Sequence, residues 1–182
     1  MRSFFYLLLI TVMAFQSCAP KAKKAHGPVK SKLGGQGTQQ IMNTVNAYYG
    51  LKNALVATDE VSARAAALNL AATATAMAQG IADSPIYTSL KLNLDTIIAQ
   101  SRIISEMQDK RCEKQRIAFS PVSDNMFAML KSADIKNGGI YQQFCPMAFN
   151  DKGAYWLSDD NEIKNPYFGK KMLECGEITD SL

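Results

Sequence analysis

Four consecutive stretches of apolar residues at helical spacing lie between residues 38 and 137, and they constrain the fold of this chain most. Apolar residues that recur every three or four positions line one face of an amphipathic helix. The four predicted core stripes are Ile41, Val45, Tyr48 and Leu55; Val61, Ala65, Leu68, Ala72 and Ala76; Ile86, Leu90, Leu94, Ile97 and Ile104; and Val122, Met126, Met129 and Leu130. With short connections between them, these helices predict a mainly α fold, an antiparallel four-helix up-and-down bundle.

Start signals divide the predicted bundle into its helices. Asp59 offers an N-cap for the second helix. Pro85 and Pro121, each preceded by serine, stand where a helix can begin, because proline is tolerated at the first helical position. The predicted helices span 38–57, 59–79, from 84 toward 116, and from 120 to about 137.

The residue pattern changes after Gly139, and we expect a small β-hairpin there. Residues 140–144 and 154–157 are rich in aromatic residues typical of strands. The turn-forming residues 150–153 lie between them. A short helical piece is predicted over 170–175.

The first residues resemble a bacterial export signal. Arg2 precedes an apolar run over 4–15, which is too short to span a bilayer comfortably. Ser17-Cys18 follows the run directly and resembles a lipobox, which implies cleavage before Cys18 and a lipid on that cysteine. The alternative is an ordinary secretory peptide with an incidental cysteine. The lipobox interpretation predicts a signal peptide over 1–17 and a protein anchored by lipid to a bacterial membrane, facing the periplasm or the cell surface.

A tether is predicted over 18–37, between the lipidated cysteine and a single domain over 38–182. The tether is rich in lysine, glycine and proline and shows no apolar periodicity. The formal charge of +4 arises at this end, since all 16 acidic residues follow residue 33. The domain itself is therefore not basic, and we expect no nucleic-acid partner.

Histidine chemistry is excluded from the domain by the sequence. The single histidine, His26, lies in the tether, so neither a Ser-His-Asp nor a Cys-His arrangement can form in the domain. A histidine-ligated zinc site is excluded for the same reason. We therefore expect no enzymatic activity and no catalytic residue.

Two sulfur motifs remain as the candidate site: Cys145-Pro146-Met147, and the segment from Met172 to Cys175. Thiolate and thioether ligands favour Cu(I) and similar soft ions. If residues 172–175 form a helical turn, both of its sulfurs share one face. The alternative is a Cys145–Cys175 disulfide, which export from the cytoplasm permits. Spacing alone leaves both interpretations open, and Cys112 is the cysteine left over.

A family resemblance adds to this interpretation. The chain resembles an uncharacterised family of bacterial envelope lipoprotein domains, which also occurs fused to periplasmic adaptor subunits of copper and heavy-metal efflux pumps. The residues that carry the resemblance are 144–147 (FCPM), 153–158 (GAYWLS), 162–176 (EIKNPYFGKKMLECG) and, more weakly, 115–123 (QRIAFSPVS). Many relatives have histidine where this chain has Ala118. The resemblance implies pump components as possible partners.

We therefore expect a lipid-anchored envelope protein that binds or delivers a soft metal ion, most plausibly Cu(I). The predicted ligands are Cys145, Met147, Met172 and Cys175. The side chains predicted to surround the site and exclude water are Tyr155, Trp156 and Tyr167. The alternative is a structural or protein-interaction module of an envelope complex, with a Cys145–Cys175 disulfide, aromatic core residues and no metal.

Overall fold

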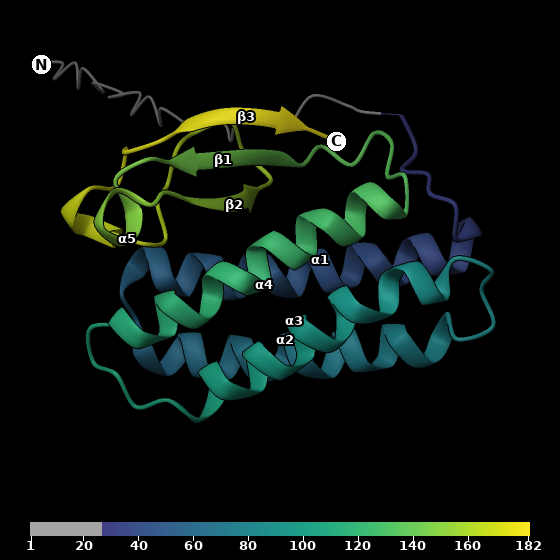
Figure 1. Cartoon of the computed structure of the whole chain (residues 1–182), viewed down its shortest axis with the longest axis horizontal. Helices are drawn as coiled ribbons and strands as arrows, with labels where there is room; N and C mark the ends of the chain where they lie inside the picture. The colour runs from purple at the N-terminus through teal and green to yellow at the C-terminus, as the bar shows by residue number, and fades with distance from the viewer. Residues whose placement is uncertain (1–26) are drawn as a thin grey trace, which may run out of the picture.

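Four long helices form the body of the protein in a computed structural model that describes residues 27–182. They are α1 (Gly34–Ala57), α2 (Glu60–Gly80), α3 (Tyr87–Glu106) and α4 (Glu113–Ser132). Consecutive helices run antiparallel and pack on one another (Figure 1). The predicted mainly α up-and-down bundle is confirmed. The signal peptide, the lipidation site Cys18 and His26 lie outside the described residues.

The N-cap predicted at the second helix is also confirmed. Thr58 ends α1 in the left-handed conformation, with φ at 58°. Asp59 then takes an extended conformation, and its carboxylate accepts a hydrogen bond from the backbone N–H of Ser62 (3.0 Å). This bond satisfies a donor that the first turn of α2 leaves without a helical partner.

Several predicted helix boundaries were wrong. Helix α1 begins at Gly34, inside the predicted tether, and the Lys32 N–H donates to the carbonyl of Ala133 (2.9 Å). Helix α3 ends at Glu106, and α4 begins at Glu113, before the proline expected to start it. Pro121 lies inside α4. Proline has no N–H to donate to the carbonyl of Ile117 one turn earlier, and the helix tolerates this because Ile117 is 62% exposed, where water can reach the backbone.

The core stripe predicted for α2 was also wrong. Val61, Ala65, Leu68, Ala72 and Ala76 are exposed. The buried residues of α2 are Ala63, Ala67, Leu70, Ala71, Ala74 and Met77. Both sets recur at helical spacing, because this helix is apolar on nearly every side, and periodicity could not distinguish between them.

A three-stranded antiparallel sheet completes the fold. The predicted hairpin is confirmed as β1 (Tyr141–Cys145) and β2 (Ala154–Ser158), joined through the turn labelled α5 (Ala148–Asp151). A third strand, β3 (Glu177–Ser181), was not predicted; it pairs with the other edge of β1, giving the order β2-β1-β3.

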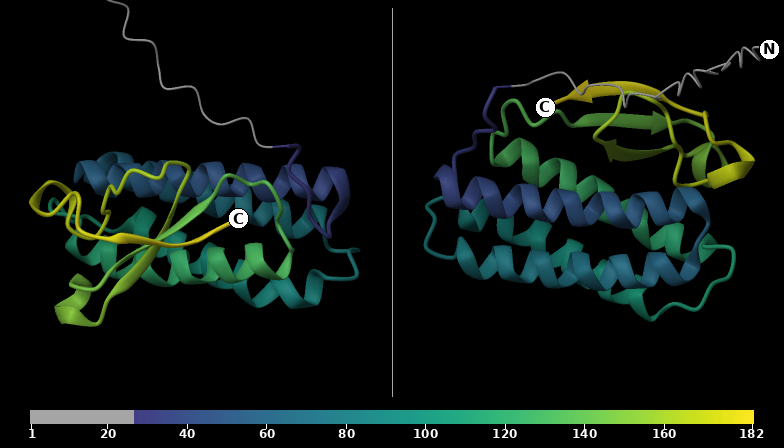
Figure 2. Two further views of the ribbon diagram at one scale, coloured as in Figure 1. Left: turned by 90° about the horizontal axis from the view of Figure 1, so that it is seen from above. Right: turned by 180° about the vertical axis from the view of Figure 1, so that it is seen from behind.

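The sheet lies across α1 and α4, on the opposite side of the bundle from α2 and α3 (Figures 1 and 2). Tyr48 of α1 joins the two layers. Its buried hydroxyl shares a hydrogen bond with the Ser123 hydroxyl of α4 (2.7 Å) and accepts one from the Leu157 N–H of β2 (3.0 Å). One phenol therefore connects both helices to the sheet.

Candidate functional site

The two thiols predicted as ligands meet at one corner of the sheet. Cys145 is the last residue of β1 and is fully buried. Cys175 lies in the segment before β3 and is partly buried. The Cys145 thiol and the backbone N–H of Met147 both lie close enough to the Cys175 thiol to change its pKa. Both cysteines are free thiols in the structure.

Strand β3, which the sequence analysis missed, brings these cysteines together. Phe144 of β1 pairs with Glu177 of β3 in an antiparallel register. Continuing that register by one residue places Cys145 beside Gly176, directly next to Cys175. The contact between two residues far apart in the chain thus follows from backbone pairing in the sheet.

Gly176 lies at this corner of the sheet, where there is no room for a side chain. Its φ is +147°, a conformation that side chains rarely allow. An added Cβ would lie 2.7 Å from Cη2 of Trp156 and 2.8 Å from the carbonyl oxygen of Phe144. Only glycine lets the backbone pass this close to the indole ring, and the turn that presents Cys175 depends on it.

The thiol–thiol contact changes the acidity of the site. The Cys175 S–H donates toward the Cys145 sulfur; this interaction, followed by burial and by the negative charge that Cys145 can carry, raises the pKa of the Cys175 thiol to about 11. The N–H of Met147 opposes this shift only in part. Cys175 is therefore a neutral thiol at neutral pH and a poor nucleophile. A soft cation that binds it must displace a proton.

The two methionines differ in their relation to the pair. Met147 adjoins the thiols through its backbone, and its side chain is 48% exposed. The helical turn predicted over 170–175 was wrong: the 3-10 helix η1 covers only Gly169–Lys171, and Met172 follows it with φ at −147°. The argument that Met172 shares a helical face with Cys175 therefore no longer applies.

The predicted aromatic shell is divided between two faces of the sheet. Trp156 and Tyr167 are buried and pack edge to face, with ring centroids 6.0 Å apart. Trp156 also lines the backbone of Gly176, so it lies next to the cysteine pair. Tyr155 is 38% exposed, and its ring packs against that of Phe144 at an angle of 36°, with centroids 4.5 Å apart.

Asn165, to which the sequence analysis assigned no role, anchors the Cys175 segment. It is fully buried. Its side-chain amide donates to the carbonyl of Cys175 (2.8 Å), and its backbone N–H donates to the carbonyl of Leu173 (2.8 Å). Its side-chain oxygen accepts from the Tyr167 N–H (2.8 Å). The Asn-Pro pair was the only sequence signal for this role.

Arg116 of α4 fastens the same segment to the helices. Its buried guanidinium donates to the carbonyls of Pro166 (2.7 Å) and Leu55 (2.9 Å) and to the Thr58 hydroxyl (2.9 Å). It also donates to the carbonyl of Arg111 (2.7 Å). Burial lowers its pKa. Since all four of these acceptors are neutral, Arg116 holds backbone in place by hydrogen bonds.

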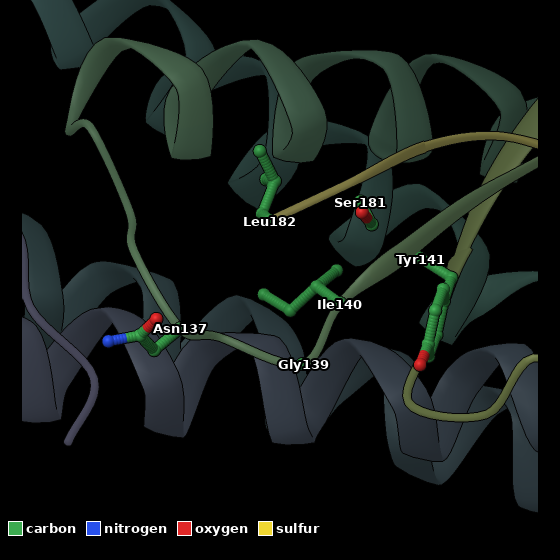
Figure 3. Close-up of a pocket in the computed structure, with 6 residues that line it drawn as sticks. All are labelled: Asn137, Gly139, Ile140, Tyr141, Ser181 and Leu182. Carbon is green, nitrogen blue, oxygen red and sulfur yellow. The ribbon is translucent and has the colours of Figure 1, made fainter. Parts of the chain in front are cut away.

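A hollow of about 190 Å³ lies at the opposite end of β1 from Cys145 (Figure 3). The residues that line it are Asn137, Gly139, Ile140, Tyr141, Ser181 and Leu182. None of these residues has a carboxylate, ammonium or thiol side chain. The cysteine corner is therefore the better candidate for chemistry.

Two kinds of feature are absent from the residues that the structure describes. Within residues 27–182, no three His, Cys, Asp or Glu side chains come together as a metal site would require. No helix in this part of the chain is both long and apolar enough to cross a membrane.

The helical body matches a known protein family. Residues 44–138 match the model of a family described as a protein of unknown function, DUF3347. The chain belongs to the DUF3347 family. The match runs from α1 to just beyond α4, so Arg116 lies within it and the cysteine pair lies outside it. The expected membership of an uncharacterised domain family is confirmed to this extent. No curated protein and no solved structure matches the chain.

Proposed function

We propose that this protein binds a soft metal ion, most plausibly Cu(I), and that Cys145 and Cys175 are its principal ligands. The observation that carries the proposal is the proximity of the two thiols, which the pairing of β1 with β3 brings to one corner of the sheet. Two thiolates suit the low coordination number and soft character of Cu(I). The ion would be cargo to be held and passed on, and the protein would catalyse no reaction.

Methionine would complete the ligand set. Met147 is the better third ligand, because its backbone already touches Cys175 and its thioether is exposed enough to reorient toward the pair. Met172 remains a predicted fourth ligand, three residues before Cys175. Trp156 and Tyr167 would exclude water from the inner side of the site, whereas Tyr155 would line its outer rim.

The cellular setting in this proposal comes from sequence resemblance. Cys18 would carry the lipid that anchors the protein in the bacterial envelope, and components of a metal-efflux pump are the proposed partners. No role with nucleic acid is proposed, because the acidic residues outnumber the basic ones in the domain beyond the tether.

Anaerobic titration of the reduced full-length chain with Cu(I), in detergent micelles and against a competing chelator, tests the proposal. We expect Cys145→Ser and Cys175→Ser to lose most of the affinity and Met147→Leu to lose less. Cys112→Ala is the matched control, because Cys112 is also buried and belongs to neither motif. A Cys145→Ser/Cys175→Ser double variant that binds as tightly as the unmodified chain would rule the proposal out.

The pH dependence gives an independent readout. Since Cys175 has a pKa of about 11, its proton must leave when the ion binds. Each proton displaced weakens apparent binding by about tenfold for every unit by which the pH falls. Affinity that does not change between pH 8 and 6 would contradict thiolate ligation by Cys175.

The same contact favours a second candidate, a disulfide-stapled interaction module of an envelope complex. The full burial of Cys145 suits a structural sulfur as well as a ligand. A disulfide between Cys145 and Cys175 would stabilise the fold by about 3–4 kcal/mol in the chain-entropy description. Mass measurement on protein isolated from the envelope separates the candidates: loss of two hydrogens at Cys145 and Cys175 supports the staple, and intact thiols support the metal site.

A further inference from the structure

The link that follows Met147, between β1 and β2, has an unusual backbone. Phe149, Asn150 and Asp151 are consecutive residues with φ at +53°, +57° and +62°. Residues with a side chain rarely adopt this left-handed conformation, and a run of three is costlier still. A backbone of this kind persists only where the surrounding structure holds it, and it clusters at functional sites. The turn labelled α5 in Figure 1 is therefore a candidate for a role at the neighbouring sulfur motif.

Phe149 is the side chain that holds these left-handed residues. Its ring packs edge to face on that of Tyr167, with centroids 5.2 Å apart and the ring planes at 67°. Tyr167 is buried and also packs against Phe119 of α4, with centroids 5.9 Å apart, so its own position is fixed. Asn150 and Asp151 are exposed. The packing of the three left-handed residues therefore depends on Phe149.

The contact between Phe149 and Tyr167 joins the two segments that carry the candidate ligands. Phe149 follows Met147 by two residues, and Tyr167 follows Asn165 by two residues. The Asn165 side chain accepts from the Tyr167 N–H (2.8 Å) and donates to the carbonyl of Cys175 (2.8 Å). The aromatic contact thus fixes the backbone of Met147 relative to Cys175. In agreement with this, the Met147 N–H lies close to the Cys175 thiol.

We propose that Phe149 is a positioning residue that holds Met147 at the cysteine pair, and that the resulting third sulfur makes the site select Cu(I) over Zn(II). This inference rests on the metal site proposed above. Thiolates bind both ions, but a thioether is a ligand for Cu(I), whereas zinc in proteins is bound by thiolate, imidazole and carboxylate groups. The domain has no histidine, so the choice between the two ions depends on thioether ligation. With its backbone fixed, the flexible Met147 side chain reaches the thiols by rotation alone.

The choice of ion is measured on the reduced full-length chain in detergent micelles, by anaerobic competition titrations with Cu(I) and, separately, with Zn(II). We expect Phe149→Ala to weaken Cu(I) binding about tenfold, as loss of a group that orients a metal ligand does, and to leave Zn(II) binding unchanged. Phe149→Leu keeps an apolar side chain that supports folding, and should show the same difference to a smaller degree. Phe149→Tyr keeps the ring and should retain the Cu(I) affinity.

Phe127→Ala is the matched control for these variants. Phe127 is a partly buried phenylalanine of α4, and its ring lies beside Lys131, with the ammonium 5.6 Å from the ring centroid. We expect this substitution to change the affinity for neither ion. Cu(I) binding by Phe149→Ala and Phe149→Leu that is as tight as in Phe127→Ala overturns the proposal.

A double-mutant cycle tests whether Phe149 acts through Met147. Adding Phe149→Leu to Met147→Leu should weaken Cu(I) binding no further, because the thioether that Phe149 positions is already gone. Additive losses, or equal losses of Cu(I) and Zn(II) affinity in Phe149→Leu, overturn the proposal, since either result would mean that Phe149 only supports the fold.

The Cys145→Ser/Cys175→Ser variant separates failure of this inference from failure of the metal site itself. If that variant binds Cu(I) as tightly as the unmodified chain, the metal site is wrong and this inference falls with it. If it loses Cu(I) while the Phe149 variants keep full affinity, the metal site stands and the positioning role of Phe149 is wrong.

Discussion

The helical body, α1 to α4, and the C-terminal segment after Gly139 bury their side chains in different ways. In the body, apolar residues at helical spacing meet across antiparallel helices. The C-terminal segment has short strands and long turns. Its path is held by individual polar groups, namely Arg116, Asn165 and Tyr48, and by Gly176.

This difference predicts which substitutions will destabilise each region. A bundle core depends on apolar volume, and it tolerates changes that conserve volume and pattern. A segment held by single hydrogen-bonding groups depends on the identity of each group, because an unsatisfied buried partner is costly. The family match covers the first region, and the candidate site belongs to the second.

The largest effect is expected in the body. Leu94 is fully buried and Leu92 is 76% exposed, two residues apart on α3. Leu94→Ala should lower the free energy of unfolding by about 3 kcal/mol, through lost burial and the cavity left behind. Leu92→Ala should change it by less than about 0.5 kcal/mol. Equal losses in urea unfolding curves would contradict this packing of α3.

A somewhat smaller effect is expected where the two regions join. Arg116→Met conserves much of the side-chain volume but leaves the carbonyls of Pro166 and Leu55 without a donor. We expect a loss of about 2 to 3 kcal/mol in the free energy of unfolding. The matched control is Arg102→Met, since Arg102 is exposed on α3. If both variants unfold at the same urea concentration, Arg116 is not an anchor.

The next effect is expected inside the C-terminal segment. Gly176→Ala forces a methyl group into the space of Trp156 at a positive φ, and should cost about 2 kcal/mol. Gly35→Ala is the control, because nothing lies within 4 Å of the added methyl group at the start of α1. That substitution should be neutral or mildly stabilising. Thermal unfolding of the two variants side by side measures the contrast.

The smallest effect concerns acidity at the cysteine pair. The hydrogen bond in which the Cys175 S–H donates to the Cys145 sulfur favours the neutral form of Cys175, so its alkylation should follow a pKa of about 11. Cys145→Ala removes that bond and should shift the midpoint down toward the ordinary thiol value of about 8.5. The rate of iodoacetamide labelling at Cys175, followed by mass spectrometry from pH 7 to 11, measures this. A profile identical in both proteins would show that the thiols are not in contact.

The raised pKa of Cys175 also predicts how the stability of the fold changes with pH. Because the pKa of Cys175 is higher in the folded protein than in the unfolded chain, the thiol stabilises the fold below the unfolded value. That contribution is lost as the pH rises toward about 11. Alkaline destabilisation should therefore be weaker in Cys175→Ser than in the unmodified chain.

Sequence reasoning reached the helices and the hairpin but missed features that depend on pairing between distant residues. The Asp59 cap and the β1–β2 hairpin were predicted because their signals are local. Strand β3 was missed because its residues are mostly polar and exposed, and it forms by pairing with the free edge of β1. The predicted helical turn at Met172 was wrong because the buried amide of Asn165 directs that backbone instead.

The two candidate cysteines show the division between sequence and structure most clearly. The sequence by itself determined that the chain forms amphipathic helices, that no histidine is available in the domain, and that two sulfur motifs lie in the C-terminal segment. These properties depend on residue type and local spacing. The tertiary structure alone decided which face of α2 is buried, and that Cys145 and Cys175 touch. Both depend on which surfaces meet in the folded protein. Helix α2 is apolar on nearly every side, so the sequence offers more than one face that could be buried. The register of β1 with β3 brings together two cysteines that are far apart in the sequence.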